Sequence, residues 1–250
     1  MQDISYTGYI LRDISCGIYK DGGIMGHRVS AIEGENPIII VVPHGYDDPN
    51  TSIVGEQIIH ELGAYGVINH GWERADKYDY YKDKANCNDI NHLHEDVVKD
   101  EFLEPLLRFA NKIGDSNVFI IHGVSNTIRN QASDLDLIIG CGQGKPDSLT
   151  CERWYLDVFM EKLIKQGFNP YVGKAGGTYS GRKKSNLNQL FRLWPQYFND
   201  AIYSLQIEVV RELRKDELTA RSTGDMIANA IEDSITTNPQ SIGSIVWNEI

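Results

Sequence analysis

Short apolar runs alternate with segments of helical spacing along most of this chain. Ile38–Val42 and Val118–Ile121 have the length of buried strands and consist only of aliphatic and aromatic residues. Between these runs, Val54, Ile58 and Leu62 recur at a spacing of four, which predicts a helix with one apolar face. Strands that alternate with helices favour a mostly parallel sheet covered on both faces.

The same pattern places the remaining elements. The predicted strands are Pro37–Val42, Val67–Ile68, Val118–Ile121, Leu135–Ile139, Pro170–Val172 and Ile202–Val210. The predicted helices are 51–65, Asp96–Ile113, Thr150–Gln166, Leu187–Tyr197 and Asp225–Ile235. Residues 71–95 are rich in Tyr and Trp, which favours a long functional loop over a solvated tail. We therefore predict a single α/β domain over residues 1–250, a mostly parallel mixed sheet with helices on both faces, and an N-terminal edge or hairpin region over residues 1–36.

Composition narrows the function without identifying it. The 250 residues are 41% hydrophobic and 24% charged, and the net charge of −11 argues against a nucleic-acid binder or a polybasic membrane surface. No apolar run approaches the roughly 20 residues that span a bilayer, and the first residues lack the pattern of a signal peptide. The four cysteines are Cys16, Cys87, Cys141 and Cys151, and no two of them form a C-x-x-C pair. These features predict a cytoplasmic protein with free thiols.

Histidines and carboxylates stand where apolar strands end. The first run leads through Pro43 into His44, with Asp47 and Asp48 just after it, and Val118–Ile121 leads directly into His122. The carboxyl ends of parallel strands meet at one edge of a sheet, so these side chains can be close in space. Two imidazoles and one carboxylate leave a fourth position open, as in catalytic zinc sites. Asp47 and Asp48 are both candidates for the carboxylate.

Glu208 lies within the apolar strand Ile202–Val210. Alternation along this strand predicts that Gln206, Glu208 and Val210 share one face, with the purely apolar side chains on the other. An ionised carboxylate in a covered sheet is costly unless it is paired or used. Glu208 is therefore a candidate general base for metal-assisted hydrolysis, and the alternative is an ion pair with Arg211 or Arg214.

These residues also carry a family resemblance. The segments Pro43-His44-Gly45, His122-Gly123 with Asp136–Gly140, and Leu205–Glu208 resemble the N-formylglutamate amidohydrolase family in order and spacing. That family implies a zinc enzyme on a carboxypeptidase-like (phosphorylase/hydrolase-like) α/β fold. The stretch from His44 to Ser52 is similar to phage poly-γ-glutamate hydrolases, and this match implies that Asp48 rather than Asp47 binds the metal.

The resemblance extends to substrate-binding positions. Gly176-Gly177-Thr178 resembles a double-glycine segment of the family, which suggests a substrate contact at Thr178, and Arg211 follows the glutamate strand. The family usually has an Asp-x-Asn-Arg segment whose arginine meets a substrate carboxylate. Here the nearest match contains Asn88 followed by Asp89, which argues against formylglutamate itself as the substrate.

Two arginines could replace the missing cation. Arg129 follows His122, and Arg182 lies in the Gly-rich loop before the last strand. Either could hold a substrate carboxylate or a developing oxyanion through a bidentate contact. The alternative for each is an ordinary surface arginine.

Other motifs give weaker signals. The turn from Gly140 to Gly144 follows a strand, but the position that a dinucleotide-binding turn needs as its third glycine is Lys145. His92 and His94 precede acidic residues that look like the entry to a helix, and Cys87 has no identifiable histidine partner.

The sequence thus predicts a zinc-dependent hydrolase that cleaves an amide bond in a small acyl-amino-acid or peptide-like substrate. One Zn²⁺ per chain would be held by His44, Asp48 and His122, with Glu208 as the base. The alternative is a relative that binds a ligand or partner without turnover.

Overall fold

The computed structural model describes residues 11–12, 29–71, 102–184, 186–193, 202–237 and 247–250. Within them, eight strands form one sheet in the order β1-β2-β4-β3-β5-β8-β6-β7. The strands are β1 (Leu11–Arg12), β2 (Val29–Ile32), β3 (Asn36–Val42), β4 (Ala64–Asn69), β5 (Ser116–Val124), β6 (Leu137–Gly140), β7 (Pro170–Val172) and β8 (Ile202–Val210).

The centre of the sheet is parallel and its flanks are mixed. Strands β4, β3, β5 and β8 run parallel to one another, whereas β2 pairs antiparallel with β4 and β6 pairs antiparallel with β8. This arrangement confirms the predicted mixed α/β sheet. The antiparallel placement of β6 puts its last residue, Gly140, opposite Gln206, two positions before Glu208 along β8.

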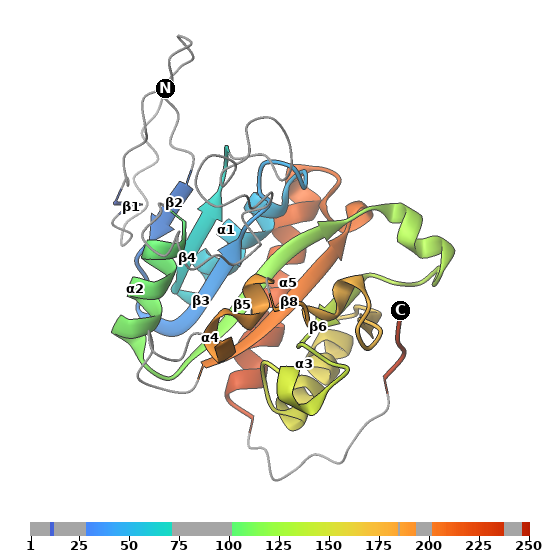
Figure 1. The fold of residues 1–250 in the computed structure, drawn as a ribbon. Helices are drawn as coiled ribbons and strands as arrows, with labels where there is room; N and C mark the ends of the chain where they lie inside the picture. Colours follow the sequence, from blue (N-terminus) through green and yellow to red (C-terminus); the bar gives the residue numbers. More distant parts are fainter. Residues whose placement is uncertain (1–10, 13–28, 72–101, 185, 194–201, 238–246) are drawn as a thin grey trace, which may run out of the picture.

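Helices cover both faces of the sheet, as predicted (Figure 1). On one face, α1 (Thr51–Leu62), α3 (Arg153–Lys165) and α5 (Glu217–Ile235) pack against alternate residues of the strands, such as Phe119 and Ile207. On the other face, α2 (Leu103–Ile113) and the short α4 (Leu190–Leu193) pack against the intervening residues, such as Ile39 and Ile120. Burial of this apolar surface is the main contribution to stability.

Most predicted elements are present with shifted ends. The strand around Val67 extends over all of β4, and the stretch predicted to be helical from Leu187 is a short 3-10 turn, Leu187–Gln189, followed by α4. The last helix begins at Glu217 instead of Asp225, because Asp216 accepts a hydrogen bond from the Thr219 N–H and caps it (2.8 Å). The first residues of the helix predicted from Asp96, most of the aromatic loop over 71–95, and Cys87, Asn88, His92 and His94 lie outside the described residues.

Candidate metal centre

The side chains predicted to act together converge at the carboxyl ends of β3, β5 and β8. His44 follows β3 by two residues, and Glu208 lies in β8. His122 lies within β5, which continues to Val124, so this histidine is held by the strand itself instead of following its end. Because β5 and β8 are parallel, His122 and Glu208 stand opposite each other in register and on the same face of the sheet.

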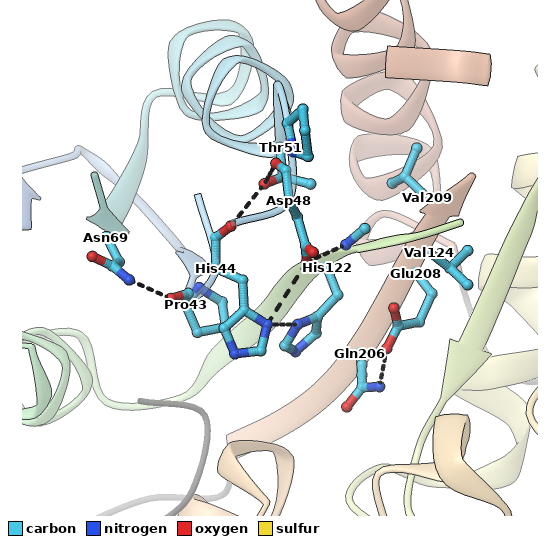
Figure 2. Close-up of polar contacts among 12 residues, drawn as sticks. Pro43, His44, Asp48, Thr51, Asn69, His122, Val124, Gln206, Glu208 and Val209 are labelled. Carbon is cyan, nitrogen blue, oxygen red and sulfur yellow. Dashed lines mark hydrogen bonds and ion pairs between the residues drawn. The ribbon is translucent and has the colours of Figure 1, made fainter. Parts of the chain in front are cut away.

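Three donor atoms lie close together in this cluster (Figure 2). The Nδ1 atoms of His44 and His122 are 3.1 Å apart, and the Asp48 Oδ2 atom is 3.7 Å from the His44 Nδ1 atom. One ligand atom from each of the three residues lies within 4.8 Å of the other two, and the residues are 3–7% exposed. Asp47, the other candidate carboxylate, does not belong to the cluster.

This donor set fits a metal ion. Ligands about 2.0–2.2 Å from a tetrahedral centre stand about 3.3–3.6 Å apart. The two observed separations, 3.1 and 3.7 Å, lie on either side of that range. Two imidazoles and one carboxylate are the kinds of ligand that zinc accepts in catalytic sites. The three buried side chains could therefore hold one divalent ion with small adjustments.

The loop between β3 and α1 is tightly bonded to itself. The Asp48 N–H donates to the His44 carbonyl (2.8 Å), and the Thr51 hydroxyl donates to the Asp48 carbonyl (2.7 Å). The Asn69 side chain donates to the Pro43 carbonyl from the end of β4 (2.7 Å). Asn50 completes the turn with a φ of 65°, a conformation that asparagine tolerates better than most residues. These bonds fix the positions of His44 and Asp48 before any ion binds.

Asp48 is also held by the strand that carries His122. The Gly123 N–H donates to its Oδ2 atom over 2.9 Å. A hydrogen bond from a neighbouring group to a ligating carboxylate orients that ligand, as such bonds do in known metal sites.

Arg214 is a buried residue of this region whose structural role the sequence did not reveal. It is 3% exposed, and its guanidinium donates to the carbonyls of Pro49 (2.6 Å), Val124 (3.2 Å) and Val209 (3.1 Å). Since these carbonyls belong to the loop after β3 and to the ends of β5 and β8, one side chain joins the three segments that carry the site. The hydrogen bonds go to backbone groups far apart in sequence, so no local motif indicates them.

Glu208 accepts a hydrogen bond from Gln206. The Gln206 Nε2 atom donates to the Glu208 Oε1 atom over 2.7 Å, and both residues are buried (Figure 2). The predicted alternation along β8 is confirmed, since Leu205, Ile207 and Val209 pack in the core on the opposite face. Of the two predicted ion-pair partners, Arg214 makes the backbone bonds described above, and Arg211 is exposed.

The two candidate substrate arginines occupy different surroundings. The Arg129 guanidinium donates to the Leu135 carbonyl (2.9 Å) and to the Asp136 carboxylate (2.8 Å), so it ties a short 3-10 turn to the start of β6. The half-buried Arg182 lies against the backbone of the Gly-rich loop, since a methyl group on Gly176 would stand 3.0 Å from its Cζ atom. Thr178 is exposed at the start of the 3-10 turn Thr178–Ser180.

Tyr179 is a further residue of this face that sequence reasoning missed. Its ring packs against an apolar cluster that includes Ile138 and Val210, which neighbour Glu208 across and along the strands. Burial and the nearby Glu208 carboxylate both raise the pKa of the Tyr179 phenol above its ordinary value, so the hydroxyl stays protonated and able to donate. Its position directly after Thr178, in a segment already marked by the resemblance, was the one available signal.

The first two N–H groups of the turn after β6 are bonded within the protein. The Gly142 N–H donates to the Ser180 carbonyl (2.7 Å), and the Cys141 N–H donates to the Gln143 side chain (2.8 Å). A methyl group on Gly142 would collide with the Ser148 carbonyl. These two N–H groups are therefore bonded within the protein instead of being directed at a phosphate, as a dinucleotide-binding turn would require.

Comparisons with known proteins show a shared fold at low identity. No family model matches the sequence, and no curated protein matches it. The solved structures similar to this chain include YNDL in a zinc-free form (15% identity, TM-score 0.51, 82% of this chain and 88% of that one). A bacteriophage poly-gamma-glutamate hydrolase matches at 13% identity and a TM-score of 0.50, over 82% of this chain and 87% of the other.

A metallo-carboxypeptidase from Burkholderia cenocepacia matches at 12% identity and a TM-score of 0.54, over 83% of this chain and 60% of that one. The expected carboxypeptidase-like fold is therefore confirmed. The similarity to a poly-gamma-glutamate hydrolase agrees with the resemblance read from the residues around His44. Among the described helices, none has the length and apolar character to cross a membrane.

Proposed function

We propose that this protein is a zinc-dependent hydrolase that cleaves an amide bond in a small acyl-amino-acid or peptide-like substrate. The observation that carries the proposal is the convergence of His44, Asp48 and His122 beside Glu208. Two imidazoles and a carboxylate are the ligand types of catalytic zinc, and a second carboxylate beside them is the group that hydrolysis needs.

The three ligands would hold one zinc ion per chain. When bound, zinc supplies Lewis acidity, which polarises the scissile carbonyl and lowers the pKa of an attacking water. The names of two similar structures, a zinc-free form and a metallo-carboxypeptidase, support a metal and favour zinc. The bonds to Asp48 from Gly123 and within the loop after β3 would keep the ligands in place during turnover.

Glu208 would move the proton. Its position opposite His122 places the carboxylate next to the metal ligands, where it can accept a proton from the attacking water and deliver it to the leaving nitrogen. The Tyr179 hydroxyl, on the same face, would donate a hydrogen bond to the substrate.

Arg182 would bind an acidic group of the substrate, with Thr178, Arg211 and Asn88 as additional contacts. Arg182 is favoured over Arg129 because the Arg129 guanidinium already bonds Asp136 and a backbone carbonyl. An arginine that must first leave such a pair binds a substrate carboxylate less tightly. No nucleic acid or membrane is expected as a partner, given the net charge of −11, and the expected compartment is the cytoplasm.

Elemental analysis of purified protein tests the metal site. The wild type should contain about one zinc per chain, His122→Ala should lose it, and His60→Ala should keep it. His60 is a matched control because it is an exposed histidine on α1 that bonds Glu61. A wild type that binds no metal after incubation with zinc, or a His122→Ala variant that keeps it, would refute the assignment.

A panel of N-formyl-, N-acetyl- and γ-glutamyl-amino acids then tests the reaction. The zinc-loaded wild type should release the amine from at least one class, and Glu208→Gln should retain zinc but keep only a small residual turnover. If the zinc-loaded protein binds these compounds and hydrolyses none, it is a binding protein with this fold and the proposed reaction is wrong.

A further inference from the structure

The face of β8 that carries Glu208 is polar along most of its length. Ser204 and Gln206 precede Glu208 on that face, and Gln206 is 2% exposed. The Ser204 hydroxyl donates to the Asn188 Oδ1 atom over 2.6 Å. The opposite face of the same strand is wholly apolar, so the sheet has no general need for polar residues here. Buried amides are costly unless both ends are bonded, which makes their partners informative.

The hydrogen bonds around Gln206 have a single possible direction. An amide side chain can turn by 180° with little change of shape, so its orientation must be assigned from its partners. The Asn188 backbone N–H can only donate, and it bonds the Asn186 Oδ1 atom over 2.8 Å. The other end of the Asn186 amide is therefore its NH₂ group.

Each bond then fixes the next one. The Asn186 Nδ2 atom donates to the Gln206 Oε1 atom over 3.3 Å, which turns the Gln206 NH₂ group toward Glu208. That group donates to the Glu208 Oε1 atom over 2.7 Å. The Asn188 N–H, at the start of the 3-10 turn Leu187–Gln189, thus sets the donor-to-acceptor direction of a series of hydrogen bonds that ends on the Glu208 carboxylate.

From this series of hydrogen bonds we infer that Gln206 is a positioning residue for the proposed general base, and that Asn186 sets the orientation of the Gln206 amide. The inference rests on the proposed function, in which Glu208 transfers the proton. The Gln206 bond holds the Oε1 atom and with it the plane of the carboxylate, so the Oε2 atom is presented in a fixed direction for proton transfer. Reversal of the Gln206 amide would place two acceptor oxygens against each other.

Substitution of Gln206 tests the link to Glu208. Gln206→Met has similar length but neither donor nor acceptor, and it should lower kcat by roughly 10- to 100-fold, as expected for loss of a hydrogen bond to a charged group. KM and zinc content should stay close to the wild-type values. The same substitution in a Glu208→Gln background should change the residual kcat by less than about 3-fold, because a residue that acts through Glu208 has no further effect once that carboxylate is gone.

Two substitutions of Asn186 test the orientation. Asn186→Asp and Asn186→Ser both keep an acceptor for the Asn188 N–H, so the cap of the 3-10 turn is retained. The aspartate attracts the Gln206 NH₂ group away from Glu208, and kcat should fall about as far as in Gln206→Met. The serine is too short to reach Gln206 and adds no charge, so kcat should fall by less than in the aspartate variant. Equal and wild-type kcat in both variants would overturn the role of Asn186.

An activity-independent measurement separates this inference from the proposed function. In the NMR spectrum of protein with ¹⁵N-labelled glutamine side chains, one Gln206 NH₂ proton should be shifted downfield and protected from exchange in the wild type. Both features should disappear in Glu208→Met, which removes the acceptor. If they disappear and no amide substrate is hydrolysed, the series of hydrogen bonds exists but the proposed function is wrong. If they persist in Glu208→Met, or Gln206→Met lowers kcat equally with and without Glu208, the inference is wrong.

Discussion

One methyl group added at Gly123 should weaken both zinc binding and folding, and the two effects can be measured separately. The Gly123 N–H bonds Asp48, and the Gly123 Cα faces both that ligand and the buried Arg214. A Cβ atom at this position would stand 2.5 Å from the Arg214 Cζ atom and 2.8 Å from the Asp48 Cβ atom. Both neighbours are fixed by hydrogen bonds, so Gly123→Ala has to displace at least one of them.

The size of the effect follows from what must move. Overpacking costs about 1–3 kcal/mol, and loss of one bond between the Arg214 guanidinium and a buried carbonyl costs about 1.5–3 kcal/mol. At about 2–4 °C per kcal/mol for a chain of this size, the melting temperature should fall by roughly 5–20 °C. Asp48 must shift by about 0.6 Å to reach ordinary contact at 3.4 Å, more than the roughly 0.2 Å that metal–ligand distances tolerate. Zinc affinity should therefore fall by roughly 10- to 100-fold.

Thermal denaturation and zinc titration against a competing chelator measure the two effects. Gly66→Ala is the control, because its methyl group would press on the flexible end of Ile59 in the core, away from the ligands. This control should change the melting temperature without changing zinc affinity. In the double variant Gly123→Ala/Arg214→Met, the added methyl group still presses on Asp48. Zinc affinity should therefore stay as low as in Gly123→Ala alone.

Wild-type zinc affinity in Gly123→Ala would refute the reasoning, since it would mean that Asp48 is not held against this strand as a ligand. A melting temperature within about 1 °C of the wild type would show that Arg214 moves at no cost. Its three hydrogen bonds would then contribute much less than buried bonds to a charged group ordinarily do.

Three other predictions rest on individual contacts in the structure. Arg182→Met should raise KM for an acidic amide substrate by roughly 10-fold or more. Arg129→Met should leave KM within about 3-fold of the wild type. It should lower the unfolding free energy by about 1 kcal/mol or less, as for a partly exposed ion pair. Steady-state kinetics and urea denaturation distinguish these outcomes, and a large KM effect confined to Arg129 would reverse the assignment. The hydrogen bond and charge of Lys112 hold the pKa of Glu33 below its usual 4.5. The ionised Glu33 therefore stabilises the folded state. This stabilisation is complete above about pH 4.5 and is lost as the pH falls through the lowered pKa. Urea midpoints measured from pH 6 to 3 should therefore fall more steeply for the wild type than for Glu33→Gln, and parallel curves would contradict this. Tyr179→Phe should lower kcat/KM by roughly 10-fold with zinc content unchanged, as for loss of one hydrogen bond to the substrate; unchanged kinetics would remove the tyrosine from the site.

Much of the site was predictable because its parts are local in sequence. His44 and His122 each come directly after or within an apolar run, and Glu208 interrupts an apolar alternation. A strand that carries a polar side chain into a covered sheet signals chemistry or pairing through the sequence alone. The predicted ends of α5, β4 and β5 differ most from the structure, because they depend on local capping and strand pairing that weak propensities do not reveal.

The sequence by itself determined the alternation of strands and helices, the α/β class, and the histidines and carboxylates at the sheet edge, because each depends on periodicity within a few residues. Only the tertiary structure decided that Asp48 joins the histidines, that His122 stands opposite Glu208, that Arg214 bonds the loop after β3, and that Asn186 bonds Gln206. Those relations depend on strand order, register and hydrogen bonds to backbone groups. Their partners are separated by tens of residues, and a local pattern carries no information about which distant segment will lie beside it.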